Sequence, residues 1–72
     1  MTFPTMQQVA AHLDAVRKGK GYTYKTLAEA TGMTAYSVRA KLAGEQPITT
    51  GDLHRITTSL GTTPGQVYSE LA

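Results

Sequence analysis

The segment from Thr23 to Leu42 constrains the fold most, because it contains two short helical patterns joined by a turn of about three or four residues. Gly32 lies in this turn, where a left-handed backbone is needed and costs glycine least. Leu27 and Ala28 provide the inward face of the first helix, and the small Ala28 allows the second helix to approach closely. Two helices packed in this way form a helix-turn-helix, whose second helix can enter the major groove of DNA. The segment therefore predicts DNA binding.

Threonine residues mark the start of every expected helix. A threonine hydroxyl caps a helix by accepting a hydrogen bond from a backbone N–H of the first turn. Around Thr34, Met33 and Val38 have the spacing of a hydrophobic staple, which fixes the angle at which the second motif helix begins. The other expected caps are Thr5, Thr23, Thr49 and Thr63. The sequence thus signals five helix starts.

Apolar residues at helical spacing extend this pattern over the rest of the chain. They predict helices at about 5–18, 50–60 and 64–71, in addition to the two motif helices. No segment alternates with the period of a β-strand. The expected fold is therefore an all-α, compact five-helix bundle in which helices two and three form the helix-turn-helix. The 72 residues fit a single domain over 1–72, with residues 1–4 as a loosely ordered lead-in.

The composition argues against several other classes of protein. The chain has no cysteine, which excludes disulfides and thiolate zinc sites, and no apolar run as long as a signal peptide or a membrane span. His12 and His54 lack neighbours at metal-ligand spacing, so each is expected to have a surface or half-buried structural role. No phosphate-binding glycine loop is present. We therefore expect a cytoplasmic protein that is not an enzyme and uses neither a metal nor a cofactor.

Basic residues concentrate in the segment that contains the motif. Between residues 17 and 41 there are six Lys and Arg residues and one Glu, a net charge of +5, whereas the remainder of the chain carries −3. A basic segment is expected where a protein faces the phosphate backbone of DNA. A solvated basic face is the alternative interpretation, but its coincidence with the motif favours double-stranded DNA as the partner.

The chain matches the pattern of a known family over about Val9 to Val67, and a smaller set of residues carries the match. This set comprises Leu27-Ala28-Glu29, Thr31-Gly32-Met33-Thr34, Val38, Gly44, Leu53, Ile56 and Leu60-Gly61. With these residues the chain resembles the Cro/C1-type, or XRE-like, repressor domains of phages and bacteria. The resemblance implies a bundle of the lambda-repressor-like DNA-binding type that binds the major groove of an operator.

Carrying the family geometry onto this chain places a recognition helix over Ala35–Leu42. At about 100° per residue, the side chains that turn inward are those of Val38, Leu42 and Ala35. Those that turn outward are Tyr36, Arg39, Ala40 and Ala43. Arginine can donate two hydrogen bonds to guanine, tyrosine offers a hydroxyl and a ring, and alanine can contact a thymine methyl group. The candidates for base contacts are Thr34, Ala35, Tyr36, Ser37, Arg39 and Ala40.

Phosphate contacts are expected at helix ends and in the loops beside them. Tyr24 and Lys25 begin the first motif helix, where backbone N–H groups and the positive end of the helix dipole favour an anion. Lys41 matches another contact region of the family, and Lys20 lies on a glycine-flanked loop. Packing is the alternative for Tyr24, and ordinary solvation is the alternative for Lys25 and Lys41.

Arg17 departs from the family pattern in its expected partner. Many members of the family pair an arginine on the first helix with a glutamate at the end of the recognition helix. Here Arg17 occupies the first position, but Leu42 occupies the second, so this salt bridge cannot form. Arg17 is then expected to be free to face DNA or solvent, and it joins the candidates for phosphate contacts.

These features predict a sequence-specific, double-stranded DNA-binding transcription regulator, similar to a phage Cro or immunity repressor, that acts by occupying an operator. The alternative is a protein-interaction module, such as an antitoxin or a helical adaptor, because fold alone does not settle function. A weak homodimer that forms mainly on DNA is also expected, since helix-turn-helix proteins usually place two recognition helices on a two-fold symmetric site. Its candidate contacts are Val67, Tyr68 and Leu71, for which packing back onto the bundle is the alternative.

Overall fold

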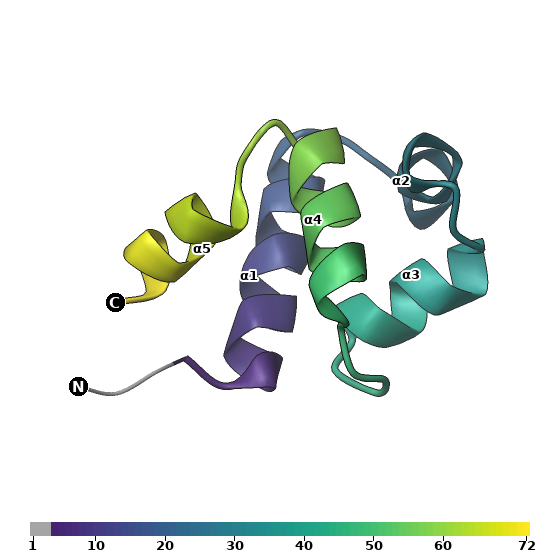
Figure 1. Cartoon of the computed structure of the whole chain (residues 1–72). Coiled ribbons are helices and arrows are strands. Elements are labelled where there is room, and N and C mark those ends of the chain that lie inside the picture. The colour runs from purple at the N-terminus through teal and green to yellow at the C-terminus, as the bar shows by residue number, and fades with distance from the viewer. Residues whose placement is uncertain (1–3) are drawn as a thin grey trace.

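The computed structural model describes residues 4–72, and every regular element in that range is an α-helix (Figure 1). The five helices are α1 (Met6–Gly19), α2 (Tyr24–Thr31), α3 (Ala35–Leu42), α4 (Thr50–Ser59) and α5 (Pro64–Leu71). The predicted all-α bundle is confirmed, and its helix bounds lie within one residue of those expected from the sequence. Of the expected lead-in at 1–4, residues 1–3 lie outside the described residues.

Local hydrogen bonds mark both ends of the helices. Each of the five threonine caps accepts a hydrogen bond, at 3.0–3.1 Å, from the backbone N–H three residues further on. Helices α1 to α4 each end beside a glycine with a positive φ. At Gly32 φ is +76°, and the N–H groups of Gly32 and Met33 both donate to the carbonyl of Ala28, which closes α2 and begins the turn of the motif.

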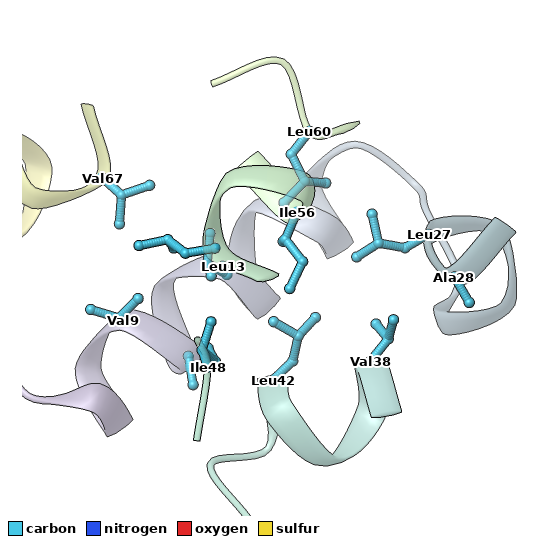
Figure 2. Close-up of a cluster of buried hydrophobic side chains, with 12 residues drawn as sticks. Val9, Leu13, Leu27, Ala28, Val38, Leu42, Ile48, Ile56, Leu60 and Val67 are labelled. Atoms are coloured by element: carbon cyan, nitrogen blue, oxygen red, sulfur yellow. The ribbon is translucent and has the colours of Figure 1, made fainter. Parts of the chain in front are cut away.

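The core orients the second helix of the motif. α2 packs against α3 and α4, and α3 also packs against α1. Figure 2 shows Val38 and Leu42 pointing from α3 toward Leu27 of α2 and Ile56 of α4. All four side chains are buried, and removing such apolar surface from water is the main force that holds the helices together. The side of α3 that carries Val38 and Leu42 is buried. The first turn of the helix is therefore exposed to solvent on the opposite side.

α5 packs against α1 and α4, on the side of the bundle away from α2 and α3 (Figure 1). Val67 is fully buried and points toward Leu13 (Figure 2), so it packs back onto the bundle and is unavailable to a second copy of the chain. Its assignment as a dimer contact is therefore wrong. Tyr68 remains 45% exposed, and Leu71 is half-buried against the core. Within residues 4–72, no helix is both long enough and apolar enough to cross a membrane.

Candidate nucleic-acid interface

The solvent-facing side of α3 and its cap gather five of the predicted base-contact residues. Thr34, Ala35 and Tyr36 are exposed, so the expectation that Ala35 turns inward is wrong. Tyr36 is the most exposed large apolar side chain described, at 64%. Ser37 and Arg39 are half-buried. The Thr34 hydroxyl accepts a hydrogen bond from the Ser37 N–H at 3.0 Å, so it caps the helix at the same point where it faces solvent. The first turn of α3 is therefore accessible to a DNA groove.

Ala40 does not share this face, and the expectation that it turns outward is wrong. Its exposed fraction is 1%. The chain folds back after α3 and covers the main chain of this residue, where the backbone N–H groups of Glu45 and Gln46 donate to the Ala40 carbonyl at 2.9 and 3.3 Å. Helical phase alone cannot predict cover that comes from the following loop. Ala40 is consequently removed from the candidates for thymine contact.

Arg39 lies between an aromatic ring and a carboxylate. Its guanidinium carbon is 5.5 Å from the ring centroid of Tyr36, within the range of a cation–π contact. Its Nη1 lies 3.3 Å from Glu45 Oε2, and both side chains of this ion pair remain substantially exposed. The cation that is best suited to bind guanine is thus held at the surface of α3 before any DNA is bound.

Arg17 is buried, so the expectation that it is free to face DNA or solvent is wrong. Its Nε donates to Asp14 Oδ1 at 3.0 Å, and its Nη1 donates to the Tyr22 carbonyl at 2.6 Å. Its guanidinium carbon also lies 4.1 Å from the ring centroid of Tyr24. Partial burial raises the pKa of Asp14, but the hydrogen bonds and charges of Arg17 and Lys18 outweigh burial, and the pKa lies below its ordinary value. Arg17 therefore braces the start of α2 against α1 instead of reaching for phosphate.

The start of α2 presents one of its two predicted phosphate contacts. Lys25 is exposed, and it forms no ion pair with any residue in 4–72. Tyr24 is half-buried and packs against the core, and its hydroxyl donates to Asp14 Oδ1 at 3.3 Å. The packing alternative thus describes Tyr24 in the free protein, whereas Lys25 is available to an anion near the N-terminus of the helix.

The two other lysines that were predicted to contact phosphate are placed differently. Lys41 Nζ lies 3.1 Å from Asp52 Oδ2 and 3.5 Å from the Pro47 carbonyl, so it joins the end of α3 to the start of α4. Burial raises the pKa of Asp52, but hydrogen bonds from Lys41 and Thr49 outweigh it and lower the pKa below its ordinary value. The Nζ of Lys20 lies next to Gly61, in the turn between α4 and α5. Neither ammonium group lies on the exposed face of α3.

Three acids form ion pairs with four of the basic residues. Asp14 holds Arg17 and Lys18, Glu45 holds Arg39, and Asp52 holds Lys41. The sequence indicates Asp52 as a capping acid of the helix after Thr49, a role that the structure confirms, but it does not indicate the pairing of these acids with basic residues. The spacing of Asp14 to Arg17 and Lys18, three and four residues along one helix, is a signal that could have identified the first cluster. The other two pairs cross a loop and have no such local signal.

The histidines lie apart from this surface. His12 on α1 is half-buried, with Nε2 3.7 Å from Glu70 Oε1 on α5, and His54 is exposed on α4. Among residues 4–72, no cluster of three or more His, Cys, Asp or Glu side chains is arranged to hold a metal ion. The arrangement of α2 and α3 therefore supplies binding groups, and the residues described here supply no candidate metal centre.

Comparison with known proteins agrees with this geometry. The model of the Cro/C1-type HTH DNA-binding domain family matches residues 12–69. Among solved structures, the clp gene regulator ClgR from Corynebacterium glutamicum is 24% identical with a TM-score of 0.84, over 96% of this chain and 74% of that chain. The restriction-modification controller protein C.AhdI from Aeromonas hydrophila is 21% identical with a TM-score of 0.82, over 88% and 96% of the two chains. The same fold forms 37% of the chain of FeII HppE, at 29% identity, a TM-score of 0.77 and 89% coverage of this chain. No curated protein gave a significant match.

Proposed function

The chain belongs to the Cro/C1-type HTH DNA-binding domain family, and from this premise we propose that it is a sequence-specific repressor that acts by occupying an operator. A phage Cro protein or an immunity repressor is the closest functional analogy. Binding itself is the mechanism, because a protein seated on an operator blocks access of the polymerase. Such a protein acts in the cytoplasm of a bacterial cell, where the DNA lies.

The observation that carries this proposal is the position of Arg39 on the accessible side of α3. The guanidinium is at the surface beside the Tyr36 ring, and Thr34, the cap of the same helix, is also exposed. An arginine in this position can bind guanine O6 and N7 in the major groove. Lys25 at the start of α2 supplies a separate, sequence-independent contact to phosphate.

Arg39→Ala and Lys25→Ala are expected to weaken DNA binding in different ways. Arg39→Ala should cost about 1–3 kcal/mol on the operator and relax the preference at one base pair, because a bidentate contact to a base is lost. Lys25→Ala should weaken binding to all duplexes by a similar factor and reduce the dependence on salt. Both variants are titrated against a site selected from a random duplex library and against scrambled duplex.

These titrations also distinguish a protein that reads DNA bases from a protein-interaction module with the same fold. Equal losses on both duplexes for Arg39→Ala would remove Arg39 from base reading. If the wild-type protein selects no sequence from the library in moderate salt, the chain is a protein-interaction module, such as an antitoxin or helical adaptor, and not a regulator that reads DNA.

We also propose that two copies bind one operator through a small contact around Tyr68 and Leu71. Tyr68 is exposed and Leu71 is half-buried on α5, which leaves a modest apolar surface. An interface of this size supports weak association, so the dimer is expected to form mainly on DNA, where two recognition helices sit about 34 Å apart.

Sedimentation velocity of the protein alone and with the selected duplex tests the dimer. We expect a monomer alone and two copies on a two-fold symmetric site, and we expect Tyr68→Ala to make the second binding step weaker. Gln66→Ala, an exposed substitution on the same helix, is the matched control. A one-to-one complex on an asymmetric site would exclude the dimer.

A further inference from the structure

The loop after α3 returns an acidic side chain to the surface of that helix. Gly44 has a φ of +80°, the left-handed conformation that glycine adopts at the lowest cost. The N–H of Gly44 donates to the Lys41 carbonyl at 3.2 Å, and the N–H of Glu45 donates to the Ala40 carbonyl at 2.9 Å. These two bonds form a Schellman motif, which reverses the chain at the end of α3. The position of Glu45 is therefore set by main-chain hydrogen bonds and not by the ion pair that its side chain makes.

The carboxylate placed in this way contacts one nitrogen of Arg39. Glu45 Oε2 lies 3.3 Å from Nη1, which leaves Nε and Nη2 of the guanidinium to donate to other acceptors. The Tyr36 ring lies 5.5 Å from the guanidinium carbon and limits its movement further. Both members of the ion pair are substantially exposed, and exposed pairs of this kind contribute little to folding. A structural role in stability does not explain the pair.

We propose that Glu45 is a positioning residue that determines the sequence specificity of Arg39. By holding Nη1, the carboxylate restrains a long, flexible side chain in the orientation in which its remaining donors face a guanine. Its negative charge beside the groove also repels phosphate, which lowers the affinity for duplexes that offer Arg39 no guanine. This inference rests on the proposed function, because it assigns to Glu45 a part in the reading of DNA by α3.

A double-mutant cycle on DNA tests the proposal. The wild-type protein first selects its site from a random duplex library, and Arg39→Ala identifies the guanine whose replacement the protein no longer detects. Binding of wild type, Glu45→Gln, Arg39→Ala and the double variant is then measured on three duplexes. These are the selected site, the same site with that guanine replaced, and a scrambled duplex.

Glu45→Gln should reduce the discrimination between the selected site and the guanine-replaced site by about three- to tenfold. It should also raise the affinity for scrambled duplex about two- to fivefold, because one negative charge is removed from the interface. In the Arg39→Ala background, Glu45→Gln should no longer change the preference for the selected site over the scrambled duplex. The melting curve followed by circular dichroism should be the same for wild type and Glu45→Gln.

Glu29→Gln is the matched control, since Glu29 is exposed on α2 and forms no ion pair with any residue between 4 and 72. It should alter binding to all duplexes by one common factor. Three results would overturn the role of Glu45 and leave the proposed function intact. These are unchanged discrimination in Glu45→Gln, an equal change in Glu29→Gln, and an effect of Glu45→Gln that is just as large without Arg39. A loss of discrimination that accompanies a lowered melting curve would assign Glu45 to folding. If the wild type selects no site, the proposed function itself fails and this inference fails with it.

Discussion

Val38→Asp is expected to unfold the protein. Val38 is fully buried between the two helices of the motif, so aspartate would place an unpaired carboxylate in an apolar core. Such a substitution costs more than about 4 kcal/mol. A core in a domain of this size rarely supplies more than about 3–5 kcal/mol of stability. Circular dichroism should therefore show no cooperative melting transition and little helix at room temperature.

Ala35→Asp is the matched control for this result. It introduces the same side chain into the same helix, but Ala35 is exposed in the first turn of α3, where an acidic residue interacts favourably with the helix dipole. This variant should melt close to wild type while binding DNA less well, because its new charge faces the phosphates. A cooperative melting curve for Val38→Asp at the wild-type temperature would show that Val38 is not in the core.

Arg17→Ala is expected to destabilise the fold by about 2–4 kcal/mol. The substitution removes a partner of Asp14, leaves the Tyr22 carbonyl without its donor, and deletes a contact with the face of the Tyr24 ring. Because these contacts connect α1 to the start of α2, the variant should also bind every duplex less tightly. Urea unfolding gives the change in the free energy of unfolding, and titration of selected and scrambled duplex gives the change in binding.

Lys18→Ala is the control that separates the effect of losing a buried side chain from the effect of losing a positive charge beside Asp14. Lys18 also contacts Asp14, at 3.4 Å, but its side chain is 69% exposed, whereas that of Arg17 is 10% exposed. Exposed ion pairs contribute about 0–1 kcal/mol, so Lys18→Ala should shift the urea midpoint only slightly. If the two variants shift the midpoint equally, Arg17 has no bracing role beyond its charge.

Most of the fold could be predicted because the signals for its helix ends are local. A threonine cap and a nearby glycine define α2 within about ten residues of sequence, and the spacing of apolar residues shows which face is buried. The same reasoning placed Tyr36 and Arg39 on the accessible side of α3, which agrees with the structure.

The errors concern contacts that depend on segments other than the helix itself. Ala40 has the phase of an outward residue, but the return of the chain after Gly44 buries it. Arg17 pairs with Asp14, three residues earlier on the same helix, whereas the family pattern points to a partner at the end of the recognition helix. The pairing of Arg39 with Glu45 requires the geometry of the Schellman motif, which the composition of the loop does not reveal.

The threonine caps and glycine ends also have a consequence for the rate at which the chain folds. Each cap joins residues that are only three apart in the sequence. The helix boundaries can therefore form without the entropy cost of closing a long loop. Helical proteins with mostly local contacts reach the native state in microseconds to milliseconds, far faster than sheet proteins of equal length. Once the whole chain is available, apolar residues are therefore exposed only briefly, which leaves proteases and other unfolded chains little time to bind them.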